Sequence, residues 1–139
     1  MRKLVSWSTL IILLGCGDTI SKTDLAHLNG YWEIEKVTLA DGKTKEYTVN
    51  TTVDLIKLEG TKGFRKKVNP KLDGTFETSN DAEFFEISPE DGRFILSYKN
   101  ELSAWKETLL GISEGYFEVS NEAGIRYMYT RFIPINANK

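Results

Sequence analysis

The chain has 139 residues, of which 27% are charged and 12% aromatic, a composition typical of one folded domain and not of a disordered segment. Its 18 basic and 20 acidic side chains give a formal net charge of −2, which excludes the strongly positive surface of a general polyanion-binding protein. The single cysteine excludes an intramolecular disulfide, so the stability of the fold must come from its core.

The first residues have the layout of a secretion signal. Arg2 and Lys3 precede an apolar run at 4–14, which is shorter than the roughly 20 residues that a membrane-spanning helix needs. The run ends at Cys16, and residues 13–16 (Leu-Leu-Gly-Cys) resemble the lipobox of bacterial lipoprotein signals. In that family a diacylglyceryl group is joined to the cysteine and the leader is cut before it. The resemblance therefore implies a signal peptide at 1–15 and a lipidated Cys16. The alternative is an unmodified cysteine in an ordinary signal peptide or a buried thiol.

The same resemblance implies a location in the cell envelope. Cleavage before Cys16 would leave 124 residues with a net charge of −4, moored to a lipid bilayer by acyl chains. Residues 16–24 are small and polar and are expected to form a tether. Gly17 stands where enterobacterial lipoproteins of the inner membrane usually have Asp, which favours the outer membrane, on its periplasmic face or at the surface.

Residues 25–135 are predicted to form one all-β domain, followed by a polar tail at 136–139. A short helix is expected only over Ser21–Leu28, with Ser21 or Thr23 as its N-cap. The runs rich in β-branched and aromatic residues, separated by turn signals that include three Asp-Gly pairs, predict strands at 31–39, 45–49, 52–59, 63–68, 75–79, 83–88, 93–99, 103–111, 116–120 and 125–133. Eight to ten short strands favour an antiparallel sandwich or barrel.

The first strand changes its hydrophobic phase. Trp32 and Ile34 share one face, whereas Val37 and Leu39 fall on the other parity. A bulge near residues 35–36 would restore a single inward face.

Two ends of the domain resemble the lipocalin family. Gly30-x-Trp32 opens the first strand, and Arg131 lies late in the last one. In lipocalins a basic residue of the last strand packs over that tryptophan and closes one end of an up-and-down barrel. The likeness is nearest to small lipocalin-like lipoproteins of Bacteroidota and implies carriage of a small hydrophobic ligand. If the first and last strands pair antiparallel, Arg131 lies beside Trp32, while Arg126 lies roughly 17 Å further along the strand.

No residue set predicts catalysis, a metal site or a cofactor. His27 is the only histidine, and it lacks the partners that a catalytic triad or a zinc site requires. Glu33 and Glu35 alternate with apolar residues and are expected on the solvent side of the first strand. An acidic group lacks the regular ligand spacing of a calcium loop and is expected to be solvated: Asp81, Glu83, Glu86, Glu90 and Asp91.

The one basic cluster, KGFRKKV at 62–68, has two interpretations. It could contact lipid head groups or a polyanion such as lipopolysaccharide. The simpler interpretation, which we favour, is a twisted or edge strand whose lysines prevent pairing with other chains.

The remaining question is whether the barrel is hollow. Aromatic mass, which includes Phe76, could fill the interior or line a pocket. The predicted pocket-lining residues are Phe85, Phe94, Leu96, Tyr98, Trp105, Phe117, Tyr127 and Tyr129. A hollow barrel predicts a monomeric, non-enzymatic carrier of a small hydrophobic ligand that binds no nucleic acid. A filled barrel predicts a protein-interaction module, such as a hydrolase inhibitor or an envelope-assembly partner.

Overall fold

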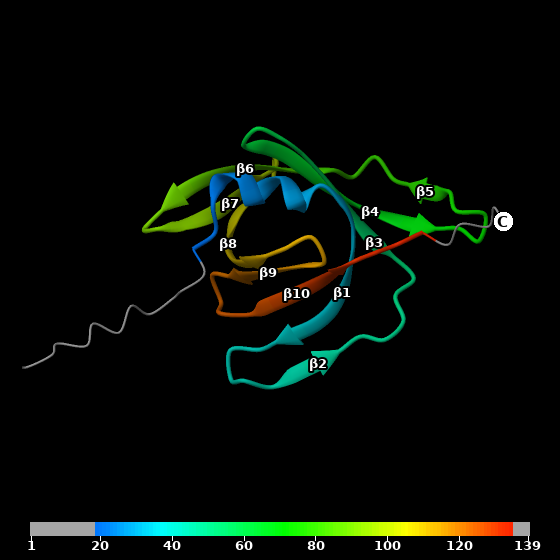
Figure 1. Cartoon of the computed structure of the whole chain (residues 1–139), viewed down its shortest axis with the longest axis horizontal. Helices are drawn as coiled ribbons and strands as arrows, with labels where there is room; N and C mark the ends of the chain where they lie inside the picture. The colour runs from blue at the N-terminus through cyan, green and yellow to red at the C-terminus, as the bar shows by residue number, and fades with distance from the viewer. Residues whose placement is uncertain (1–18, 135–139) are drawn as a thin grey trace, which may run out of the picture.

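The computed structural model describes residues 19–134. The predicted signal peptide at 1–15, the predicted lipidation site Cys16 and the predicted tail at 136–139 lie outside the described residues. The first element of the described residues is the 3₁₀-helix η1 (Lys22–Leu28), which starts inside the segment predicted as a tether and has Ser21 as its N-cap. Ten strands follow (Figure 1): β1 (Gly30–Thr38), β2 (Thr44–Glu46), β3 (Val53–Glu59), β4 (Lys62–Pro70), β5 (Phe76–Thr78), β6 (Glu83–Glu90), β7 (Arg93–Lys99), β8 (Ala104–Ile112), β9 (Tyr116–Asn121) and β10 (Arg126–Arg131).

Eight of these strands close into an antiparallel barrel. The order around the barrel is β1-β3-β4-β6-β7-β8-β9-β10, and β10 pairs again with β1 through the register Trp32↔Arg131. The two short strands lie off this ring, β2 on the end of β1 and β5 on the end of β4. The predicted all-β antiparallel barrel is confirmed. Within residues 19–134, no helix is long and apolar enough to span a membrane.

A bulge in β1 keeps one face turned inward. The register with β10 runs from Ile34↔Tyr129 to Lys36↔Met128, so one extra residue of β1 is left between the two pairs. Beyond this point Val37 pairs with Tyr127, which restores the apolar parity. The predicted bulge near residues 35–36 is confirmed.

The turn between β6 and β7 shows why Asp-Gly pairs punctuate the chain. Asp91 has φ 51° and Gly92 has φ 75°, and two successive positive φ values define the type I′ turn that matches the twist of a hairpin. This hairpin aligns Phe94 with Pro89 and Leu96 with Ile87, so the inward faces of both strands meet.

The domain has two hydrophobic clusters, one inside the barrel and one outside. The inner cluster is built around Trp32 and Phe117, which are 0% and 1% exposed. The outer cluster lies between the wall and the β5 arm, where Phe76 stacks on Tyr31 with ring centroids 4.1 Å apart. Tyr31 neighbours the inward Trp32 and therefore points outward. The two expectations for Phe76, that it fills the barrel or that it lines a pocket inside it, are both wrong, because its strand lies outside the ring.

Candidate functional site

The end of the barrel next to η1 is plugged. The guanidinium carbon of Arg131 lies 4.2 Å from the centroid of the Trp32 ring, and such a stack contributes about 0.5–2 kcal/mol. The indole N–H of Trp32 donates to the Leu28 carbonyl over 2.8 Å, which ties the helix to the first strand. Arg126 pairs with Thr38 at the other end of β1.

Arg131 also holds the chain around this plug through backbone carbonyls. Its side chain donates to the carbonyl oxygens of His27 (2.7 Å), Asn29 (2.8 Å) and Glu114 (2.5 Å). Gly30 lies under the guanidinium with φ 134°, and a Cβ at this position would collide with Arg131. The Gly-x-Trp pattern thus has a structural role: it lets the arginine reach the indole and the carbonyls together.

The predicted pocket-lining residues all belong to the interior cluster or pack against it. Five are buried, at 1–7% exposure: Phe85, Leu96, Tyr98, Phe117 and Tyr129. The half-buried Phe94, Trp105 and Tyr127 pack against them. Phe117 stacks on Tyr129 at 4.6 Å between ring centroids, and Tyr98 stacks on Trp105 at 5.2 Å. These five side chains pack closely against one another inside the barrel.

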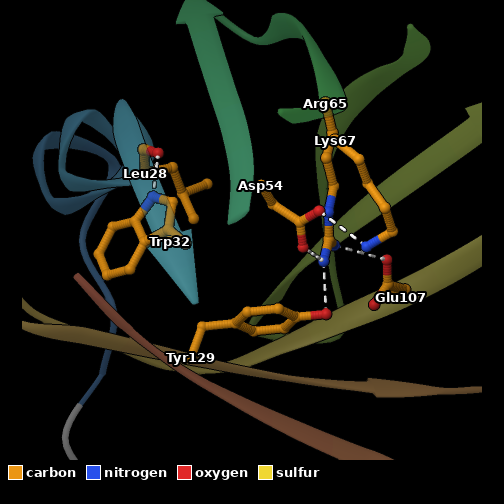
Figure 2. A network of polar contacts seen from close by, with 7 residues as sticks. All are labelled: Leu28, Trp32, Asp54, Arg65, Lys67, Glu107 and Tyr129. Carbon is orange, nitrogen blue, oxygen red and sulfur yellow. Dashed lines mark hydrogen bonds and ion pairs between the residues drawn. The ribbon is translucent and has the colours of Figure 1, made fainter. Parts of the chain in front are cut away.

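A charged network completes the filling (Figure 2). The Arg65 side chain is only 12% exposed and donates from Nη2 to Asp54 Oδ2 over 2.6 Å and to the Tyr129 hydroxyl. Its Nη1 lies 3.7 Å from a Glu107 carboxylate oxygen, and its guanidinium carbon lies 4.7 Å from the centroid of the Tyr129 ring. Lys67 Nζ reaches the other oxygen of Asp54 over 3.0 Å. The barrel thus encloses an arginine paired with two carboxylates.

The two carboxylates of this network have opposite pKa shifts. Burial alone would raise the pKa of Asp54, but the charges of Arg65 and Lys67 outweigh it and hold the pKa below its ordinary value. Burial raises the pKa of Glu107, and the nearby Arg65 offsets only part of that effect. Burial also raises the pKa of Tyr98, whose hydroxyl has no hydrogen-bond partner of good geometry among the described residues, although Arg65 and Glu107 lie close by. Such pKa shifts are typical of buried polar groups that interact with one another.

The basic cluster at 62–68 is not an edge strand. β4 pairs with β3 on one side and, over residues 62–65, with β6 on the other, so the edge-strand alternative within the favoured interpretation is wrong. Alternation along β4 places Arg65 and Lys67 on the same face as Asp54, where the Lys67 side chain is still 73% exposed, whereas Lys62 and Lys66 lie on the outer wall. The cluster is therefore divided between two faces and presents no continuous basic surface. The sequence reasoning missed Arg65 and Asp54 as a pair, although Asp54 interrupts the otherwise apolar run at 53–56.

An open hollow lies on the outer wall of the barrel, beside the C-terminal end of η1. It is a groove of ≈ 720 Å³. Its outward-facing side chains are Tyr31, Leu55, Lys57, Phe64 and Phe84, with Glu59 and Lys62 at the β3–β4 turn. Lys57 lies opposite Phe64, and Phe64 lies opposite Phe84 on the next strand.

Phe84 is the most accessible aromatic of this groove, at 63% exposed, and its ring centroid lies 6.1 Å from that of Phe64. A signal for it exists in the sequence. In the doublet Phe84-Phe85 of an alternating strand, only one ring can enter the core, so the other must face outward.

A second hollow of ≈ 310 Å³ is polar. Its lining includes Asp54, Arg65 and Lys67, whose charges already pair with one another, together with Asp81 and Glu83. Among residues 19–134, no group of three or more histidine, cysteine, aspartate or glutamate side chains is placed to hold a metal ion. His27 is exposed on η1, and only its carbonyl takes part in the plug.

No family model and no curated relative matches the sequence. Among solved structures, the chain is similar to a lipocalin-like protein from Bacteroides uniformis, with 13% identity, a TM-score of 0.49 and coverage of 76% of this chain and 99% of that one. It is also similar to apocrustacyanin C1, with 12% identity, a TM-score of 0.47 and coverage of 79% and 63%. Lobster apocrustacyanin A1 follows at 13% identity and a TM-score of 0.44, with coverage of 76% and 61%. The chain thus matches less than two thirds of each crustacyanin. All three TM-scores are below 0.5, so the fold assignment stands on the closed barrel itself.

Proposed function

We propose that this chain is a non-enzymatic, lipocalin-like binding protein of the bacterial envelope, and that it binds a small hydrophobic ligand in the outer groove. The observation that carries this proposal is the groove's size and lining. At ≈ 720 Å³ it falls within the range of about 300–1,000 Å³ that small-molecule sites occupy. Its outward-facing walls are mainly aromatic and aliphatic, with a few charged groups to orient a ligand.

The groove suits an apolar ligand better than the barrel interior does. Phe85, Phe117 and Tyr129 are 4%, 1% and 7% exposed, so a ligand could enter only by displacing them. Below them, Arg65 is held by Asp54 and the Tyr129 hydroxyl. Opening this core would break charge-assisted hydrogen bonds, whereas filling the groove would cover a Phe84 ring that is already 63% exposed.

A second candidate function is a protein-interaction module with a filled barrel. The packed interior favours it, and exposed aromatic side chains such as Phe84 are common anchors of protein interfaces. In that case the groove would take a side chain of a partner protein in place of a small molecule.

An apolar fluorescent probe separates these two functions. The protein would carry Cys16→Ser, so that no attached acyl chain competes for the groove. We expect saturable binding of the probe, weakened at least about fivefold by Phe84→Ser, because that change removes the most accessible ring of the site. Leu102→Ser is the matched control, since Leu102 is 95% exposed and lies in the β7–β8 connection away from the groove.

Native mass spectrometry of the same protein should show a co-purified hydrophobic small molecule that Phe84→Ser depletes. Absence of saturable probe binding, or an equal effect of both substitutions, would contradict ligand binding in the groove. It would leave the interaction module as the better proposal.

The anchor has a separate test. We propose that Cys16 carries the lipid and that the protein resides at the outer membrane. Cys16→Ser should then move the protein from the membrane fraction to the soluble envelope fraction and remove labelling by a radioactive fatty acid. An unchanged membrane pool of the variant would contradict lipidation at this residue.

A further inference from the structure

Lys57 places a positive charge inside the apolar groove without an ion-pair partner among the described residues. Lys57 is exposed on the outer face of β3, between Leu55 and Glu59 on the same face, and it lies opposite Phe64. Among residues 19–134, the groove lysines Lys57 and Lys62 take part in none of the ion pairs, whereas Lys67, on the other face of β4, is paired with Asp54. The positive charge of Lys57 is therefore available to whatever occupies the groove.

The other charges around the groove do not neutralise Lys57. Glu59 and Lys62 face each other across the β3–β4 hairpin, and Lys62 also lies opposite Glu86 of β6. Lys66 adds another positive charge beside Leu55 on the same outer wall. The lysines on this wall thus outnumber the carboxylates that face them, and the excess lies next to the aromatic floor.

We propose, on the basis of the binding site in the groove, that its ligand is a free single-chain amphiphile with an anionic head group. The apolar chain lies along Leu55, Phe64 and Phe84, and the carboxylate or phosphate head pairs with Lys57. A neutral ligand would leave the lysine unused, and a cationic one would be repelled by it. An ion pair at the edge of an apolar surface is stronger than one in open water, because the local dielectric is lower.

Three probes with the same alkyl chain test the head group: dodecanoate, dodecanol and dodecyltrimethylammonium, each below its micelle threshold. Each would compete with the apolar fluorescent probe on the Cys16→Ser protein. We expect dodecanoate to bind at least about fivefold more tightly than the cationic probe, with dodecanol between them. Lys57→Met should remove most of this preference while leaving dodecanol affinity within about twofold, because the methylene stem is kept.

Lys99→Met is the matched control, since Lys99 is an exposed, outward-facing lysine at the end of β7. It should leave all three affinities unchanged. If Lys99→Met lowers dodecanoate affinity as much as Lys57→Met does, the effect is that of net charge and the assignment to Lys57 is overturned.

The outcomes separate this inference from the proposed function. If all three probes bind equally and Phe84→Ser weakens them equally, the groove binds apolar chains but the head-group assignment is overturned. If no probe binds, the proposed ligand binding in the groove is itself overturned, and the head-group proposal with it. In a further arm, sedimentation with phosphatidylglycerol vesicles should show no dependence on Lys57. Vesicle binding that requires Lys57, without dodecanoate binding, would replace the free amphiphile by a bilayer surface and overturn the proposal.

Discussion

Two arginines in this barrel stack on aromatic rings, and they belong to two different regions. Arg131 covers Trp32 at the plugged end, with 4.2 Å between the guanidinium carbon and the ring centroid. Arg65 covers Tyr129 inside the barrel, with 4.7 Å between the corresponding points. The aromatic contact is nearly the same, so the regions differ in what else each guanidinium binds.

Arg131 donates to three backbone carbonyls, which carry no net charge and do not titrate. Arg65 donates to the Asp54 carboxylate and the Tyr129 hydroxyl and lies near Glu107, so its partners are side chains that titrate. At the plugged end, Arg131 thus binds only uncharged backbone groups. The Arg65 network, in contrast, is a set of paired charges inside the barrel. The first joins the first and last strands of the barrel at one end; the second ties the strands together across the interior.

The largest expected effect is the loss of the Arg65 charge. Arg65→Met leaves Asp54, which is 4% exposed, with only Lys67 as a counter-ion, and it leaves Glu107 with none among the described residues. We expect the free energy of unfolding to fall by about 3 kcal/mol or more, because an uncompensated buried charge is costly. Equilibrium urea unfolding measures this change.

Arg126→Ala is the control for Arg65→Met. Arg126 pairs with Glu118 at 3.7 Å, with its side chain 53% exposed, so its loss should cost less than about 1 kcal/mol. If Arg65→Met does not fold, Arg65→Lys keeps the charge and should recover part of the stability. A loss for Arg65→Met no larger than that of Arg126→Ala would show that the interior network contributes little.

Arg131→Met is expected to have the next largest effect, about 2–3 kcal/mol, from the lost stack on Trp32 and the lost bonds to His27 and Asn29. Its effect should be local as well as global, because these bonds hold η1 across the end of the barrel. Hydrogen exchange of the η1 amides should accelerate more than that of β7. Equal acceleration of both elements would contradict the inference that Arg131 stabilises mainly the helix η1.

Gly30→Ala should cost about 1–3 kcal/mol, through a φ of 134° and the collision of its Cβ with Arg131. A double-mutant cycle separates these two causes. In the Arg131→Met background, Gly30→Ala should cost less, because only the backbone strain remains. Fully additive costs would show that the guanidinium does not depend on the glycine.

The sequence predicts the plug well because its parts are tied to strand ends. Gly30-x-Trp32 marks the start of the first strand, Arg131 marks the end of the last, and antiparallel closure brings the two ends together. The ten strands and the bulge near residue 35 follow for the same reason: alternation and turn residues are local properties of the chain.

The sequence does not predict the Arg65 network, because its parts depend on the register between strands. Arg65 lies in a run of basic residues that suggests a solvent-exposed edge, and nothing local reveals that β4 has a neighbour on each side. The outer groove is hidden similarly, since Tyr31, Phe64 and Phe84 come together only through three pairings among the four strands β1, β3, β4 and β6. Whether a barrel is hollow depends on how such side chains fit, which alternation alone does not determine.

The smallest expected effect is also the one that separates the two arginine regions most cleanly. The pKa of Asp54 is held below its ordinary value of 3.8, so its stabilising contribution is present above that pH and is lost as the pH falls through the folded-state pKa. The pKa of Glu107 is raised above its ordinary value of 4.5, so the folded state binds its proton more readily. Stability from that proton is present below pH 4.5 and is lost as the pH rises through the raised pKa.

Asp54→Asn should therefore flatten the stability curve below pH 3.8, and Glu107→Gln should flatten it above pH 4.5. Arg131→Met should lower the whole curve without changing its shape, because the acceptors of Arg131 are carbonyls. Urea unfolding at intervals of pH measures all three curves. The curve for Arg131→Met could instead change shape as much as that of Asp54→Asn. That result would show that the Arg131 plug and the Arg65 network are energetically coupled.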